Sequence, residues 1–227
     1  ALDPVLKQHA KGGKFAGAPF ALAGHSIGCR LMARVAARAR ALMSLEPKVV
    51  FALDFPPQNV AMMSEDGFRL LCEDAAAFME INNPLVVKAS QGLGEGDRIL
   101  KMWQADLKFA NETCIAGFHV FQCPVVVLIA ARNFLSAFLP EDAGPDQCEW
   151  HARRAHISAS RPENAHDFDR ESFEEWKHWT KAGCSVIDVD ADHMSIKSSP
   201  LASEIIYGHL KAVRYDLVVG SSSDVTT

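Results

Sequence analysis

The stretch ALAGHSIGCRLMARVAARARAL, residues 21–42, places a serine between two glycines where an apolar run gives way to a helix. The run APFALAG (18–24) is typical of a buried parallel strand, and residues 27–43 are rich in helix-forming Ala, Leu, Arg and Met. Ser26 therefore stands at a sharp strand-to-helix turn, with Gly24 and Gly28 two residues away on each side. This arrangement predicts a nucleophile elbow, in which the glycines relieve clashes around a strained serine. An ordinary strand–helix turn is the alternative.

Three further apolar runs follow the first one. They are KVVFALD (48–54), CPVVVLIAA (123–131) and CSVIDVD (184–190). Helical patterns separate them, including an amphipathic segment at 169–183 and a last helix that begins at Ser199-Pro200 and runs to about Val213. Strands that alternate with helices predict an α/β fold, with a mostly parallel sheet and helices on both faces.

One connection is too long for a plain crossover. Residues 60–122 are mostly helical in pattern, so we interpret them as a helical lid inserted between two strands. The predicted domain spans residues 1–219, and the polar tail 220–227 is expected to be disordered.

Polar residues follow the strands at the sheet edge where parallel α/β proteins place their chemistry. Ser26 follows the first strand, Asp54 the second, and His193 lies in the loop after the fourth. The order Ser, Asp, His is that of an α/β-hydrolase triad, which predicts a nucleophile, an orienting acid and a general base. Asp190 and Asp192 are alternative acids. Asp54 could instead be a solvated turn residue.

Composition excludes several classes of function. The chain has 227 residues and a net charge of −5, which argues against a nucleic-acid binder, and no apolar run approaches the length of a membrane span. Its six cysteines form no C-x-x-C pair, so neither a metal site nor a disulfide framework is expected. A reducing, cytoplasmic location is the simplest interpretation, although a targeting segment before Ala1 could have been lost.

Three motifs carry a family resemblance. PFALAGHSIG, ALDFPP and DADHMS resemble the nucleophile, acid and histidine motifs of thioesterase domains from polyketide and nonribosomal peptide synthases. The resemblance implies an α/β-hydrolase fold and release of an acyl or peptidyl chain from a carrier-protein thioester, by hydrolysis or cyclisation. It implies no bound cofactor, because the carrier protein presents the substrate on its phosphopantetheine arm. A general carboxylesterase or lipase-like hydrolase, and a weak remnant that binds a carrier protein or acyl chain, are the alternatives.

Several further residues have predicted roles that follow from their position in the sequence. The amide of Ile27 is the predicted oxyanion donor. Apolar side chains in the predicted lid could line an acyl channel or simply form its core; they are Met62, Met63, Phe68 and Phe78. Arg30, Arg34 and Arg38 recur every four residues on the elbow helix, which predicts a solvated face or a docking patch for an acidic carrier protein.

The chain departs from this family before the elbow. Only 25 residues precede Ser26, whereas the family has two or three strands there. We therefore expect the first strands of the fold to be missing by N-terminal truncation, and the elbow strand to lie at or near a sheet edge. The loop that supplies the second oxyanion amide in the family has no counterpart that the sequence reveals.

Overall fold

The computed structural model describes residues 3–60, 65–82, 96–112, 120–132, 168 and 170–220. The chain forms two compact units. The first consists of Ala1–Pro57, Gly117–Arg132 and Arg170–Thr227, and the second of Gln58–Ala116 and Asn133–Asp169. Of the predicted tail 220–227, Gly220 is the last residue of a helix rather than disordered, and residues 221–227 lie outside the described residues.

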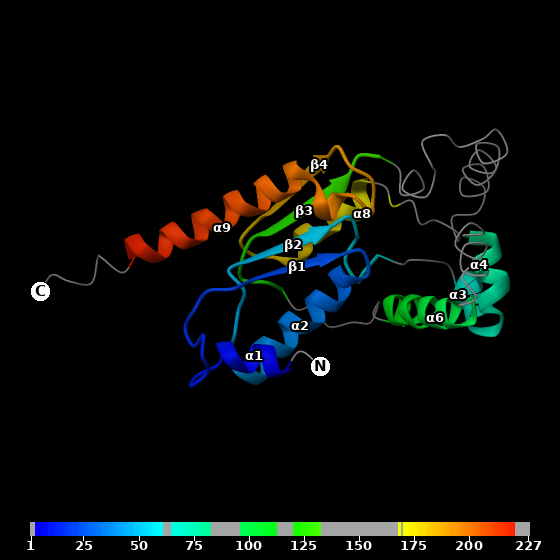
Figure 1. Ribbon diagram of the computed structural model, residues 1–227, viewed down its shortest axis with the longest axis horizontal. Coiled ribbons are helices and arrows are strands. Elements are labelled where there is room, and N and C mark those ends of the chain that lie inside the picture. The colour runs from blue at the N-terminus through cyan, green and yellow to red at the C-terminus, as the bar shows by residue number, and fades with distance from the viewer. Residues whose placement is uncertain are drawn as a thin grey trace, which may run out of the picture. The chain divides into compact units, whose positions relative to one another are not determined.

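The first unit contains a parallel sheet of four strands in the order β1-β2-β3-β4 (Figure 1). The strands are β1 (Ala21–His25), β2 (Val49–Leu53), β3 (Val125–Ala130) and β4 (Cys184–Val189). β2, β3 and β4 fall within their predicted apolar runs, and β1 extends one residue past its run to His25, so the predicted parallel α/β sheet is confirmed. All four carboxyl ends therefore lie at the same edge of the sheet.

The central strands β2 and β3 are almost fully buried because helices cover both faces of the sheet. Val49, Phe51 and Leu53 of β2 pack on one face against Ile196 and Ala202 of the last helical segments. Residues between them, such as Val50 and Ala52, point to the other face and are equally buried. An unbroken apolar run is what a strand covered on both faces requires.

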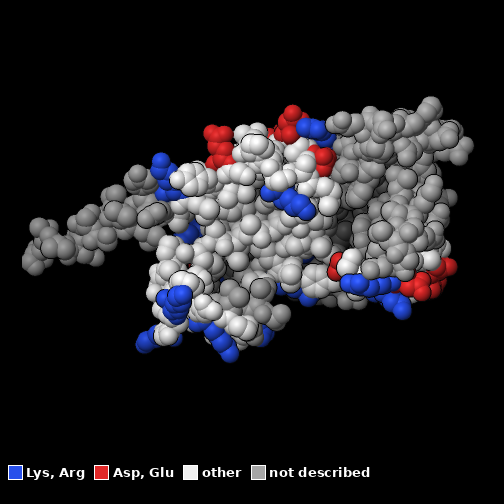
Figure 2. All heavy atoms as spheres, viewed as in Figure 1, with Lys and Arg blue, Asp and Glu red and all other residues white. Residues whose placement is uncertain are grey.

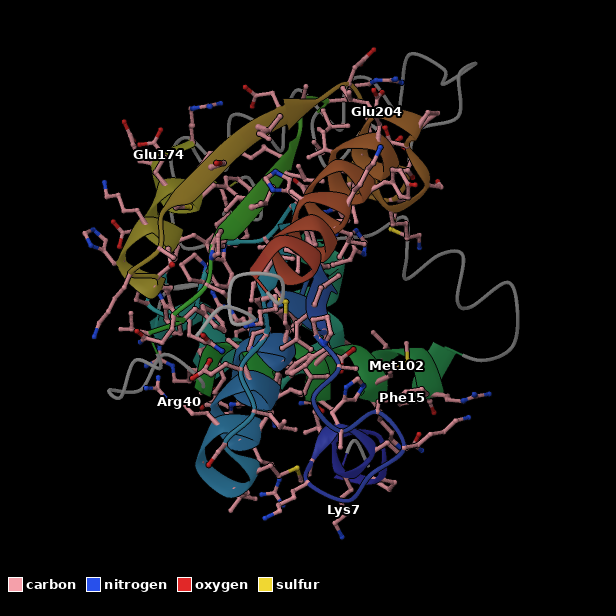
Figure 3. All side chains as sticks on the ribbon, turned by 90° about the vertical axis from the view of Figure 1, so that its left-hand side faces the viewer. Lys7, Phe15, Arg40, Met102, Glu174 and Glu204 are labelled. Carbon is pink, nitrogen blue, oxygen red and sulfur yellow. The ribbon has the colours of Figure 1, made fainter. Side chains whose placement is uncertain are left out.

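The helices of this unit are α1 (Asp3–His9), α2 (Gly28–Met43), α8 (Arg170–Glu174), η3 (Glu175–Trp179), η4 (Ile196–Ser198) and α9 (Pro200–Gly220). Figures 1 and 3 show α2, which carries Arg40, and α9, which carries Glu204, on opposite sides of the sheet. The Ser199 hydroxyl accepts a hydrogen bond from the Ala202 amide at 3.4 Å, so the predicted Ser-Pro start of α9 is correct.

Two predicted helices differ from those observed. Segment 169–183 was expected to be one amphipathic helix, but α8 gives way to a 3-10 turn at Glu175. The tighter turn brings Trp176 and Trp179 onto one side, where both are buried and the Trp176 indole donates to the Phe55 carbonyl at 2.9 Å. The last helix continues past Val213 to Gly220.

Strand β1 forms one edge of the described sheet, as predicted. Residues 3–20 contain α1 and turns but no strand. The side chains of β1 are accordingly less buried than those of β2, and Ala23 is exposed. The edge position leaves one row of β1 backbone groups without a neighbouring strand among the described residues.

Surface charge in this unit is unevenly distributed. Residues 1–57 contain eight Lys and Arg against three Asp and Glu, although the whole chain is acidic. Figure 2 shows basic side chains gathered over the end of the unit that holds α1 and α2, and acidic ones near β4. Arg30 is an exception, because it is fully buried with its guanidinium 5.3 Å from the centre of the Phe55 ring. The predicted arginine face of α2 is therefore wrong for Arg30, while Arg34 and Arg38 are exposed.

The second unit contains α3 (Glu65–Glu73), α4 (Ala75–Asn82) and α6 (Gly96–Glu112). The Asp74 carboxylate caps α4 by accepting a hydrogen bond from the Ala77 amide at 2.9 Å. Gln104 of α6 donates to the Leu71 carbonyl of α3, which ties these helices together. The predicted insertion is thus helical in its described part, and its role as a lid stays a prediction.

Candidate active site

Ser26 lies in a strained turn directly between β1 and α2. Its φ is +55°, a left-handed conformation that costs a non-glycine residue free energy. The Ser26 amide donates to the Leu53 carbonyl at 3.0 Å, which fixes the turn against the end of β2. Because α2 begins at Gly28, its N-terminal amides and dipole lie beside the serine and favour negative charge there.

The two glycines of the elbow are not equivalent. A Cβ atom at Gly24 would lie 2.6 Å from the Cα atom of Cys29 and 2.6 Å from the Gly28 carbonyl oxygen. A Cβ atom at Gly28 would meet no described atom within 4 Å. The close approach of strand and helix thus depends on Gly24, and the expectation that Gly28 also avoids a clash is wrong.

This difference gives a stability prediction. Gly24→Ala should lower the free energy of unfolding by about 1–3 kcal/mol, because strand and helix must separate to admit the methyl group. Gly28→Ala, the matched control, should leave stability unchanged or raise it by up to about 1 kcal/mol, since alanine favours a helix. Urea denaturation of both variants measures the effect, and equal stabilities would contradict the assignment of the close contact to Gly24.

Asp54 is buried just past β2, with 9% of its surface exposed. Its amide donates to the Leu128 carbonyl at 2.8 Å, and its φ of +51° turns the side chain back over the sheet edge. Carboxylate atom Oδ1 accepts a hydrogen bond from the Ala130 amide at 2.9 Å. Carboxylate atom Oδ2 lies at hydrogen-bond distance, 2.7 Å, from Nδ1 of His193. The alternative of a solvated turn aspartate is therefore wrong.

His193 lies in the turn between β4 and η4 and is only 4% exposed. The turn is shaped by Asp192, whose Oδ1 accepts hydrogen bonds from the amides of Met194 and Ser195 at 2.8 and 2.9 Å. This turn directs the His193 ring toward Asp54 rather than toward solvent. A buried carboxylate on Nδ1 favours the tautomer in which Nε2 is free to accept a proton.

The two alternative acids are engaged elsewhere. Asp192 accepts hydrogen bonds from the amides of its own turn. Partial desolvation raises its pKa, but the hydrogen bonds from Ser195 and Met194 and the charge of Arg132 together lower it. Asp190 is exposed and pairs with Arg132, with 3.0 Å between its Oδ1 and the arginine Nε. The structure therefore brings Asp54, and neither alternative, to the His193 ring.

The remaining predicted residues are distributed over both units. Ile27 lies at the start of α2, and no described residue accepts a hydrogen bond from its amide. Phe68 is half-buried in α3 and Phe78 is buried in α4, both in the second unit. Met62 and Met63 lie outside the described residues. In the part of the chain that the structure describes, no group of His, Cys, Asp or Glu could hold a metal ion.

Two residues beside Ser26 received no role from the sequence. His25 places its ring against His193, with 4.7 Å between the ring centres. Its position directly before the elbow serine was the available signal. Cys29 is fully buried with its thiol 3.1 Å from the Gly24 carbonyl, and burial raises the pKa of the thiol. Cys29 therefore stays protonated and does not compete as a nucleophile.

A parallel sheet, a strained serine after β1 and a buried Asp–His pair past later strands define an α/β-hydrolase-like fold. The family model of the thioesterase domain matches residues 8–212, so the chain belongs to the thioesterase domain family. This membership supports a thioesterase, and hence a hydrolase, role. No curated protein sequence matches the chain. Among the described helices, none has the length and apolar character needed to cross a membrane.

Solved structures with the same fold come from several thioesterases. The RedJ thioesterase of the prodiginine biosynthetic pathway in Streptomyces coelicolor is 18% identical, with 92% of this chain and 67% of that chain covered and a TM-score of 0.58. Human thioesterase 2 is 16% identical, with 94% and 77% covered and a TM-score of 0.57. ClbQ from the colibactin NRPS/PKS pathway is 14% identical, with 88% and 72% covered and a TM-score of 0.51.

Proposed function

We propose that this protein is a serine thioesterase that cleaves acyl thioesters through an acyl-Ser26 intermediate. The observation that carries the proposal is the buried pair of Asp54 and His193, joined at 2.7 Å, at the sheet edge where β1 turns through Ser26. A buried carboxylate on Nδ1 serves an imidazole that must gain and lose a proton at Nε2. Family membership supports a thioester as the bond that is cleaved.

The proposed reaction has two steps. In the first, Ser26 Oγ attacks the thioester carbonyl while His193 Nε2 takes the serine proton, and the Ile27 amide donates to the developing oxyanion. The carbon–sulfur bond then breaks, and the departing thiolate takes that proton from His193. In the second, His193 removes a proton from water, and the resulting hydroxide attacks the carbonyl carbon of the acyl-serine. The bond from that carbon to Ser26 Oγ then breaks, Oγ takes the proton back from His193, and a carboxylic acid and free Ser26 are released. An internal nucleophile in place of water would release a ring.

The proposed substrate is an acyl, polyketide or peptidyl chain on the phosphopantetheine arm of a carrier protein. Support comes from two proteins of the same fold that belong to biosynthetic pathways, RedJ to the prodiginine pathway and ClbQ to the colibactin NRPS/PKS pathway. Met62, Met63 and Phe68 are proposed to contact the acyl chain, because methionine and phenylalanine side chains suit an apolar ligand of variable shape. Phe78 was predicted with them, but its burial favours the alternative of a core side chain.

Two assays test this function. The protein should hydrolyse an acyl N-acetylcysteamine thioester with a kcat/KM about tenfold or more above that for the matching oxoester, given that the leaving thiolate needs less protonation than an alkoxide. A fluorophosphonate should label wild-type protein but not Ser26→Ala. A preference for the oxoester would instead indicate a general esterase. Folded protein that neither turns over nor labels would indicate a non-catalytic binding protein.

A further inference from the structure

The side chain of His25 contacts the main chain of the candidate base, His193. Its Nε2 atom lies 2.6 Å from the carbonyl oxygen of His193, and the two rings are tilted by 36° with their centres 4.7 Å apart. His25 is also the last residue of β1 and directly precedes Ser26. We propose that His25 is a positioning residue, which fixes His193 relative to Ser26 by donating a hydrogen bond to the His193 carbonyl.

The direction of this hydrogen bond follows from its acceptor. A carbonyl oxygen can only accept, so Nε2 of His25 must carry the proton. His193 is then held at two points, its ring by Asp54 through Nδ1 and its main chain by His25. Without the second anchor, the turn that carries His193 could shift as a unit, and the ring would move with it.

The anchor is built into the same dipeptide as the proposed nucleophile. His25 and Ser26 are consecutive, and the backbone of β1 next to them is packed against the start of α2 through Gly24 and Cys29. One peptide unit, the His25 side chain and one hydrogen bond therefore connect Ser26 to the main chain of His193. Such a short connection limits relative motion of the two groups, and displacement of a reacting group by about 1 Å can cost about 10²-fold in rate.

The charge of His25 suits this role. Burial is the largest effect and lowers the pKa of His25. The hydrogen bond to the His193 carbonyl raises the pKa, the charges of His193 and Lys197 lower it, and the charge of Asp54 raises it, so that the pKa is lowered overall. A lowered pKa means that His25 is neutral at neutral pH and gains a proton only as the pH falls through that value. In the proposed reaction His193 becomes positively charged, and a neutral ring at 4.7 Å does not oppose that charge as an imidazolium would.

The test compares two variants, His25→Gln and His25→Asn, whose side-chain amides place a hydrogen-bond donor at different positions. The side-chain nitrogen of glutamine reaches the position of histidine Nε2, whereas that of asparagine reaches only the position of Nδ1. We would measure phosphonylation by a fluorophosphonate, in which the Ser26 oxygen forms a bond to phosphorus, fluoride leaves, and His193 takes the serine proton. His25→Gln should keep the maximal rate within about fivefold of wild type, and His25→Asn should lower it by about 10–100-fold with unchanged inhibitor affinity.

The outcomes separate this proposal from the proposed function on which it rests. Wild-type protein that labels no faster than Ser26→Ala would overturn the serine mechanism itself. If wild type is labelled and His25→Gln and His25→Asn are labelled at the same rate as wild type, positioning by His25 is overturned. It is also overturned if both variants are equally slow while their melting temperatures equal that of wild type. If His25→Asn does not fold, His25→Ala takes its place in the test. The alanine variant also lacks the donor at the Nε2 position, so it should be slowed by the same factor.

Discussion

Asp54→Asn is expected to lower kcat by about 10⁴-fold while leaving the fold intact. The asparagine oxygen can still accept from the Ala130 amide, as Oδ1 of Asp54 does at 2.9 Å. Its NH₂ group then faces Nδ1 of His193, and two donors cannot share that contact. The imidazole must therefore place its proton on Nε2, where it can no longer accept the proton of Ser26.

The matched controls for this variant are the two other aspartates near His193. Asp190→Asn breaks an exposed ion pair with Arg132 and should change kcat by less than about twofold. Asp192→Asn keeps the Oδ1 acceptor of its turn and should also have a small effect. Thioester turnover of the three purified variants, with circular dichroism to check folding, measures the comparison. A larger loss for Asp192→Asn than for Asp54→Asn would show that the assignment of the acid is wrong.

Ser26→Ala is expected to abolish turnover, with a loss of about 10⁴-fold or more in kcat, because no other group replaces the nucleophile. Cys29, three residues further on, is fully buried and remains protonated, so it cannot substitute. The variant should still bind substrate, since the hydroxyl contributes to the chemical step. Single-turnover kinetics with the acyl thioester measures the loss.

Ser26→Gly separates catalysis from backbone strain. Both Ser26 variants should be inactive, but glycine adopts a φ of +55° without the steric cost that alanine retains. The glycine variant should therefore be more stable to urea than the alanine variant by about 1 kcal/mol. Equal stabilities would contradict the strained geometry of the turn, whereas residual turnover near the wild-type level would contradict the role of Ser26.

The sequence by itself determined the sheet and the order of the candidate residues. Apolar runs as long as a strand and bounded by glycine, proline or aspartate have few structural solutions, and β2 and β3 form where those runs predict. Ser26, Asp54 and His193 could be singled out as candidates because parallel strands all end at one edge of a sheet, so residues just past the strands lie near that edge.

Only the tertiary structure decided which aspartate faces His193. The sequence favoured Asp54 by its place just past the second strand but left Asp190 and Asp192 as alternatives, and what separates the three is burial and the hydrogen-bond donors that other segments supply. The burial of Arg30, with its guanidinium over the Phe55 ring, could not be predicted either, since a helical spacing of arginines does not reveal which of them the fold will bury. The contact of His25 with the His193 carbonyl joins residues 168 positions apart. No local sequence pattern predicts such a contact, because it forms only when the fold brings the end of β1 and the turn after β4 to the same edge of the sheet.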